Sequence, residues 1–125
     1  MFTLRFDMRS PVGGAPTAEL YAAALEMAAW SETRGAILSI VCEHHGLDDG
    51  YLPAPMVLAT ALAARSSVLP ILVAVVVLPL HDPIRLAEEM IVLDLISSGR
   101  VSYVTAVGYR QDEYELFGVD FRRRG

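Results

Sequence analysis

Two nearly uninterrupted apolar segments constrain the fold of this chain more than any other feature of its sequence. Residues 36–42 and residues 69–78 contain no charged side chain and are rich in β-branched residues. Such runs are typical of strands that are covered on both faces, as in parallel sheets. Weaker strand patterns cover residues 2–7 and 101–107. The sequence therefore predicts four strands.

Three helical patterns separate these strands, over residues 16–35, 53–64 and 82–99. Apolar residues recur at helical spacing in the first and third patterns, which predicts their buried faces. The predicted buried residues are Leu20, Ala24, Met27 and Trp30 in the first helix, and Ile84, Ala87, Ile91 and Leu95 in the third. Asp82 followed by Pro83 indicates a helix start, with the aspartate as N-cap. Residues 109–125 follow as a polar and aromatic tail with room for a short fourth helix.

Strands that alternate with helices in this way predict an α/β fold with parallel pairing and right-handed crossovers. We expect one domain over residues 1–125, because this length suits a single domain. Two architectures remain open at this point. The four βα units are half of a (β/α)₈ barrel, or they form a flavodoxin-like doubly wound open sheet.

Charge and composition exclude several classes of function. The net charge is -5, and all ten basic residues are arginine. That balance argues against nucleic-acid binding, which needs clustered positive charge. The longest charge-free stretch, residues 66–80, is shorter than the roughly 20 residues of a membrane-spanning helix. Residues 1–10 lack the apolar core of a signal peptide, and Cys42 has no second cysteine to pair with, so we expect a cytoplasmic protein.

The loops that follow the strands are where parallel α/β folds place their ligands. These loops begin near Asp7, Glu43, Pro79 and Gly108, and the second is the richest, because it opens with Glu43-His44-His45. An imidazole there is a natural proton donor or acceptor near neutral pH.

A purely structural role for this loop is the alternative, in which His44 and His45 bond to Asp48 or to a backbone carbonyl. Adjacent strand residues point to opposite faces, so the two histidines do not easily share one ion. There is also no H-E-x-x-H spacing in the chain. We therefore expect no metal site.

Several longer motifs resemble one known family, the luciferase-like flavin-dependent monooxygenases. The resemblance runs from about Phe2 to the last residue, with its motifs in the family's order. They are Glu43-His44-His45-Gly46, the run from Leu78 to Glu88, the segment from Val92 to Ser97 with Gly99-Arg100, Gly108-Tyr109-Arg110, and Phe117-Gly118. Together these motifs are far more specific than any one of them.

The resemblance implies a (β/α)₈ barrel that uses reduced FMN or the deazaflavin F420 to oxidise small molecules. It places His44 beside the flavin ring as the catalytic acid or base, with Glu43 in the same motif. It implies that Ala74 and Val75 lie under the ring, where many members have a non-proline cis peptide. Ala106 and Gly108 would lie at flavin-facing positions of the fourth strand and the loop after it.

Departures from the family pattern limit this expectation. Val104 and Ala106 stand where the family usually has glycine, and added methyl groups there would crowd a flavin. The chain is also about half the length of a typical barrel of about 250 residues, so we expect the chain alone to be impaired or inactive. Two copies could close a barrel as a homodimer. If this assembly is active, we expect it to act on a small-molecule substrate. The alternative is a non-catalytic half-barrel scaffold, natural or engineered, that self-associates.

Overall fold

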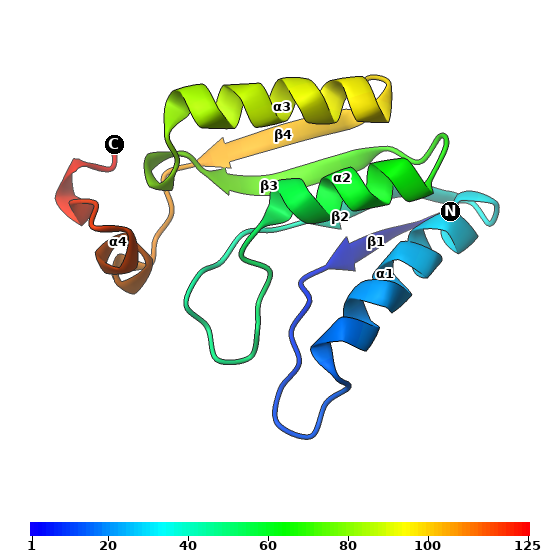
Figure 1. Cartoon of the computed structure of the whole chain (residues 1–125), viewed down its shortest axis with the longest axis horizontal. Helices are drawn as coiled ribbons and strands as arrows, with labels where there is room; N and C mark the ends of the chain where they lie inside the picture. Colours follow the sequence, from blue (N-terminus) through cyan, green and yellow to red (C-terminus); the bar gives the residue numbers. More distant parts are fainter.

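The computed structural model describes all residues, 1–125, as a single sheet with helices between its strands (Figure 1). The strands are β1 (Phe2–Phe6), β2 (Ala36–Val41), β3 (Ile71–Val77) and β4 (Val101–Ala106). The helices are α1 (Thr17–Glu32), α2 (Pro55–Arg65), α3 (Pro83–Ser97) and α4 (Gln111–Phe117), with 3₁₀ turns η1 (Leu78–Leu80) and η2 (Phe121–Arg123). The predicted strands and helices are therefore all present, and β3 is shorter than predicted because it begins after Pro70 and because Leu78 belongs to η1.

The four strands pair in parallel in the order β1-β2-β3-β4. This confirms the α/β fold with parallel strands. A doubly wound sheet reverses its strand order at a switch point, and this sheet has no reversal. The flavodoxin-like alternative is therefore wrong, because each crossover here advances to the next neighbouring position. That is the arrangement of successive βα units in a (β/α)₈ barrel.

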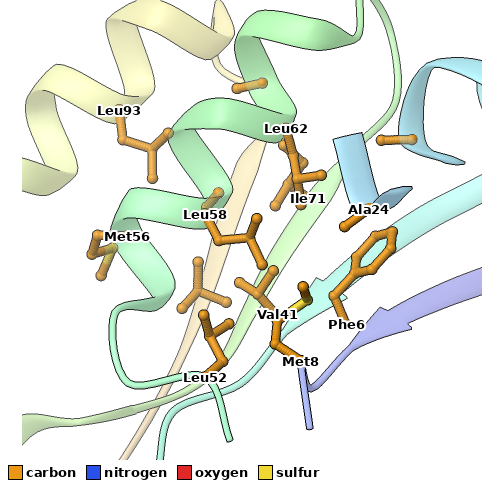
Figure 2. Packing of buried hydrophobic residues seen from close by; sticks show 14 of the residues in the cluster. Phe6, Met8, Ala24, Val41, Leu52, Met56, Leu58, Leu62, Ile71 and Leu93 are labelled. Carbon is orange, nitrogen blue, oxygen red and sulfur yellow. The ribbon is translucent and has the colours of Figure 1, made fainter. Parts of the chain in front are cut away.

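The hydrophobic core lies between the sheet and the three long helices, which share one side of it (Figure 1). Figure 2 shows side chains of α2 packing onto strand residues, with Leu58 and Leu62 above Val41 and Ile71. Leu62 and Val41 are fully buried. Since burying a side chain of this size contributes roughly 1.5–3 kcal/mol, α2 anchors the middle of the layer.

The buried face of α3 differs from the predicted one. Ile84, Ile91 and Leu95 are exposed, whereas Leu86 and Leu93 are buried in the core. The sequence of α3 is apolar on two sides, so periodicity alone does not identify the side that meets the sheet.

The predicted face of α1 is partly wrong as well. Ala24 and Ala28 are buried, but Met27 and Trp30 are exposed at 47% and 55%. At about 100° per residue these two residues rotate onto the flank of the helix, away from the sheet.

The sheet surface opposite the helices, here called the inner face, carries Arg5, Ile40, Leu72, Ala74 and Val104. The first three form one row across the sheet, because Arg5 pairs with Ile40 and Ile40 with Leu72. Ala74 and Val104 are paired one row further on. Val104 is 45% exposed, and Ile40, Leu72 and Ala74 are half-buried. No helix in the structure combines the length and hydropathy that a bilayer crossing requires.

Candidate functional site

The carboxyl ends of the strands, the long loop after β2 and helix α4 gather at one edge of the molecule (Figure 1). Backbone hydrogen bonds fix the loop there. The Leu52 N–H donates to the Asp7 carbonyl at 2.9 Å, and the His44 N–H donates to the Leu52 carbonyl at 3.0 Å. The loop therefore folds back over its own start and holds the Glu43-His44-His45 segment in place.

Glu43 is buried at the centre of a cluster of two histidines, with only 1% of its surface exposed. Its Oε1 lies 2.8 Å from His45 Nε2 and 2.7 Å from His81 Nε2, and its Oε2 accepts from the Val77 N–H at 2.7 Å. Burial alone raises the pKa of this carboxyl, but the hydrogen bonds from His45, His81 and Val77 outweigh it and lower the pKa to about 2. Glu43 is therefore a buried carboxylate with three hydrogen-bond partners, and it joins the loop after β2 to the end of β3 and to His81 after η1.

His44 belongs to a second, more open cluster. Its Nδ1 lies 2.8 Å from Glu113 Oε1, and the same oxygen accepts from the His45 N–H at 3.1 Å. Arg110 Nε lies 3.5 Å from this oxygen as well. Because a carboxylate accepts, His44 Nδ1 carries a proton, and its Nε2 makes no hydrogen bond within the chain. The His44 side chain keeps 19% of its surface exposed, and Nε2 is its one ring nitrogen without a partner in the chain.

Aromatic rings hold the His44 imidazole from two sides. The Tyr51 ring packs edge-on against it with centroids 4.6 Å apart, and the Tyr109 ring lies at 5.9 Å. Tyr51 Oη is 3.4 Å from Cys42 Sγ and accepts from Arg5 Nη2 at 3.2 Å. A chain of contacts therefore runs from His44 through Tyr51 to the inner face.

The ends of β3 and β4 hold the other residues expected at the site. The peptide bond between Ala74 and Val75 is cis, as the resemblance implies, and both residues are half-buried. Ala106 pairs with Val77, and Gly108 follows with φ +71°. A Cβ added to Gly108 would lie 2.8 Å from Val77 Cγ1. Glycine is therefore required here both by conformation and by the closeness of β3.

The structure changes the predicted hydrogen-bonding partners in the second loop. Neither histidine bonds to Asp48, because His44 pairs with Glu113 and His45 with Glu43. Sequence reasoning missed Glu113 altogether. The only available signal was that it lies between two motifs of the family resemblance, Gly108-Tyr109-Arg110 and Phe117-Gly118.

Two further findings concern metals and cavities. No group of three or more His, Cys, Asp or Glu side chains is placed to hold a metal ion. The Nε2 atoms of His45 and His81 both form a hydrogen bond with the same oxygen of Glu43, Oε1. The largest groove, of about 600 Å³, lies between α2 and α3 on the outer surface and includes none of the candidate site residues.

The residues where the inner face meets the carboxyl ends of β3 and β4 fit the ring of a flavin better than its phosphate. Ala74 and Ala106 have small side chains, so they take up little of the room in front of β3 and β4. Val104 narrows this room, because its exposed side chain stands on the same face. Arg110, in the loop after β4, is already paired with Asp112 and Glu113. The chain thus supplies a ring platform, but Arg110 is not free to hold the phosphate.

The chain is similar to known monooxygenases in sequence and in fold. The alkanal monooxygenase alpha chain of the Kryptophanaron alfredi symbiont is 33% identical over 90 residues, which are 72% of this chain and 25% of that protein. The monooxygenase RslO1 from Streptomyces bottropensis superposes with a TM-score of 0.89 at 22% identity, over 99% of this chain and 39% of that one.

Two more solved structures share the fold and name cofactors. The oxygenating constituent of 3,6-diketocamphane monooxygenase from Pseudomonas putida, in complex with FMN, matches 94% of this chain and 32% of its own, with a TM-score of 0.83 at 20% identity. The coenzyme F420 dependent tetrahydromethanopterin reductase from Methanopyrus kandleri matches 96% and 30%, with a TM-score of 0.65 at 19% identity.

The family model for luciferase-like monooxygenases matches residues 4–125, almost the whole sequence. The chain spans a quarter of the alkanal monooxygenase and about a third of the structures it resembles. It therefore carries one part of the architecture of these proteins. On this match, the chain belongs to the luciferase-like monooxygenase family.

Proposed function

We propose that this chain is the N-terminal part of a flavin-dependent oxidoreductase that oxidises a small organic molecule, with His44 as its acid-base group. The observation that carries the proposal is the pairing of His44 with Glu113. Glu113 fixes the proton on Nδ1 and leaves Nε2 free at the carboxyl edge of the sheet. A neutral imidazole with one fixed tautomer accepts a proton through Nε2 and returns it through the same atom.

The surroundings of His44 support this role. Tyr51 and Tyr109 restrict the rotation of the ring, so Nε2 keeps one direction. The partly exposed side chain lets a ligand reach Nε2. When His44 takes up a proton, the carboxylate of Glu113 stabilises the resulting charge. His44 therefore has the orientation, access and charge compensation of a proton-transfer group.

The residues that would hold the flavin ring are Ala74, Val75, Ala106 and Gly108, at the ends of β3 and β4. When bound, reduced FMN supplies two electrons for the activation of oxygen, and reduced F420 supplies them as a hydride. In either case the chain positions His44, keeps the ring against an apolar surface and moves a proton at Nε2.

We assign Glu43 a positioning role rather than direct contact with substrate. Both of its oxygens are engaged, by His45, His81 and the Val77 N–H. Its carboxylate ties the start of the histidine loop to the end of β3, which would fix His44 relative to the flavin platform. The buried free thiol of Cys42 supports a cytoplasmic setting, where thiols stay reduced.

Titration with oxidised FMN and with F420, followed by quenching of their fluorescence, tests the proposal. We expect saturable binding of at least one of them at tens of micromolar or below. Ala106→Phe fills the platform and should abolish binding. Val68→Phe adds the same bulk at an exposed position near the opposite end of the sheet and should leave binding unchanged. Absence of quenching by either flavin at these concentrations would overturn cofactor binding by this chain.

Self-association is a second candidate function, favoured by the apolar inner face and by the free edges of β1 and β4. Unpaired strand edges and uncovered apolar surface both promote pairing between copies. Two copies related by a two-fold axis would cover both features. Light scattering at several concentrations tests this, and a soluble monomer at all of them would contradict it.

A further inference from the structure

Arg5 is the one charged residue among the five that define the inner face, and it has no acidic partner. It stands in the row with Ile40 and Leu72. Its Nη2 donates to Tyr51 Oη at 3.2 Å and lies 3.9 Å from Cys42 Sγ, and its other guanidinium N–H groups make no hydrogen bond within the chain. An exposed cation thus adjoins a half-buried apolar surface.

The carboxylates around Arg5 are already engaged elsewhere. Asp7, on the same strand edge, binds the Arg9 side chain through Oδ2 at 2.9 and 3.1 Å. Asp49, in the loop that carries Tyr51, accepts the Tyr51 N–H through Oδ1 at 3.2 Å. Glu43 and Glu113 form hydrogen bonds with the histidines. Arg5 therefore forms no salt bridge at this edge, and the nearby charge of Asp7 is shared with Arg9.

Tyr51 connects this charge to the proposed proton-transfer group. Its hydroxyl accepts from Arg5, so its own proton is available to Cys42 or to an incoming acceptor. Its ring packs against His44 at 4.6 Å. A ligand oxygen at Arg5 would consequently lie one aromatic side chain away from His44, with the apolar row beside it.

We propose that Arg5 and the Tyr51 hydroxyl bind the carboxylate of the substrate, so that the site selects organic acids with an apolar body. This inference rests on the proposed function, because it names the substrate class of the same site. The guanidinium fork donates two N–H groups to a carboxylate, and the tyrosine hydroxyl donates a third hydrogen bond. The apolar body then covers Ile40 and Leu72, in the row of the sheet that begins at Arg5.

A phosphate group of the cofactor has the same anionic chemistry, and the site favours the carboxylate. One guanidinium and one hydroxyl match the single charge of a carboxylate, whereas a phosphate dianion is usually held by several N–H donors. Neither the start of a long helix nor a second free cation adjoins Arg5, because Arg9 is paired with Asp7.

Binding of 4-butylbenzoate and of its uncharged amide, 4-butylbenzamide, to the full chain tests the inference. Both are measured by ligand-observed NMR, with inorganic phosphate and FMN as separate titrants. We expect the benzoate to bind more tightly than the amide. Arg5→Gln should weaken benzoate binding about tenfold or more and leave the amide unchanged, since a hydrogen bond to a charged group is worth about 1.5–3 kcal/mol, roughly 10- to 150-fold. Tyr51→Phe should weaken it less, because it removes only the hydroxyl.

Arg34→Gln is the matched control, because it removes one exposed arginine charge from the turn before β2, at the opposite end of the strand. It should change neither affinity. Equal binding of the benzoate to wild type and Arg5→Gln, or no preference for benzoate over amide, would overturn the inference. Loss of FMN or phosphate binding in Arg5→Gln with unchanged benzoate binding would overturn it too, since Arg5 would then serve the cofactor. FMN binding by Arg5→Gln itself tests the proposed function independently.

Discussion

Two histidine–glutamate clusters lie side by side at the carboxyl edge of the sheet, and they differ in how much of their hydrogen-bonding capacity is free. In the Glu43 cluster the carboxylate is buried and binds two imidazoles and a backbone N–H. In the Glu113 cluster the carboxylate is equally buried, but its histidine keeps one nitrogen free and part of its surface exposed. The first cluster is closed, and the second is open.

The difference shows how one short segment, Glu43-His44-His45, serves two purposes. Consecutive residues of an extended chain point in opposite directions, so Glu43 and His45 lie on one side and meet, while His44 turns toward α4. The closed cluster fixes the segment, and the open cluster presents its reactive nitrogen. We therefore expect changes in the first to act on stability and changes in the second to act on the orientation of His44.

Glu43→Gln should produce the largest effect. The amide loses the negative charge that accepts hydrogen bonds from two imidazoles and the Val77 N–H, and removing one side of a buried charged network costs about 3–5 kcal/mol. Urea unfolding followed by circular dichroism measures this loss. Glu26→Gln, which removes an exposed carboxylate paired with Arg65, is the control and should cost less than about 1 kcal/mol. Similar losses in both variants would contradict the central place of Glu43.

The pH dependence of stability should follow from the same cluster. The pKa of Glu43 is lowered to about 2 from 4.5, so its contribution is complete above pH 4.5 and is lost as the pH falls toward 2. The difference corresponds to about 3 kcal/mol. The hydrogen bond to Glu43 raises the pKa of His81 above 6.5, and that contribution is complete below pH 6.5 and is lost as the pH rises through the raised value.

Carbon-13 NMR of the glutamate carboxyl groups measures the Glu43 titration directly in the wild-type chain. Urea unfolding between pH 2.5 and 7 then relates it to stability. Asp7 and Glu32 also have lowered pKa values, but they are present in every variant and cancel in the comparison with Glu43→Gln. A Glu43 resonance that titrates near pH 4.5 would contradict the closed cluster.

Gly108→Ala should destabilise the chain by about 2–3 kcal/mol, because it disturbs Val77, a hydrogen-bond partner of Glu43 in the closed cluster. The new Cβ would meet Val77 Cγ1 at 2.8 Å, and Val77 donates the backbone hydrogen bond to Glu43. Positive φ adds strain for an alanine. Gly118→Ala is a matched control, with φ +68° and no atom within 4 Å of the new Cβ. It carries the conformational strain alone, so its thermal shift should be clearly smaller.

Glu113→Gln should change the open cluster with a smaller loss of stability, of about 1–2 kcal/mol. The amide can present its NH₂ group to His44, so the imidazole should populate both tautomers instead of the Nδ1–H form alone. Nitrogen-15 shifts of the His44 ring distinguish the tautomers. The His45 ring, whose Nε2 bonds to Glu43, serves as an internal reference and should keep its pattern. An unchanged His44 pattern would remove Glu113 from its positioning role.

The clusters also show which parts of the molecule the sequence could predict. The strands, the Asp82 N-cap and the strand-end position of His44 depend on local patterns, and all are found where expected. The partner of His44 was not predictable, because Glu113 lies 69 residues away and reaches it only when α4 folds over the strand ends. Local pattern specifies elements, whereas the pairing of side chains depends on how distant elements pack.

The helices illustrate the same limit in their packing. Periodicity placed Ile84, Ile91 and Leu95 in the core, but the sheet meets the side of α3 that carries Leu86 and Leu93. Either side is apolar enough to be buried, so the choice depends on the register between α3 and its neighbours, which local pattern does not encode. The exposed side of α3 contributes Ile91 to the outer groove beside α2.

The smallest expected effect concerns the room in front of the open cluster. Val104→Gly removes an exposed isopropyl group from the inner face, so it leaves no internal cavity and should cost only about 1 kcal/mol, mainly through backbone entropy. If Val104 crowds the flavin platform, this variant should bind FMN more tightly, by a few-fold in fluorescence quenching. Val92→Gly makes a comparable change on the outer surface and should leave FMN binding unchanged. Unchanged FMN binding by Val104→Gly would mean that the Val104 side chain does not limit the space for the flavin in front of the open cluster.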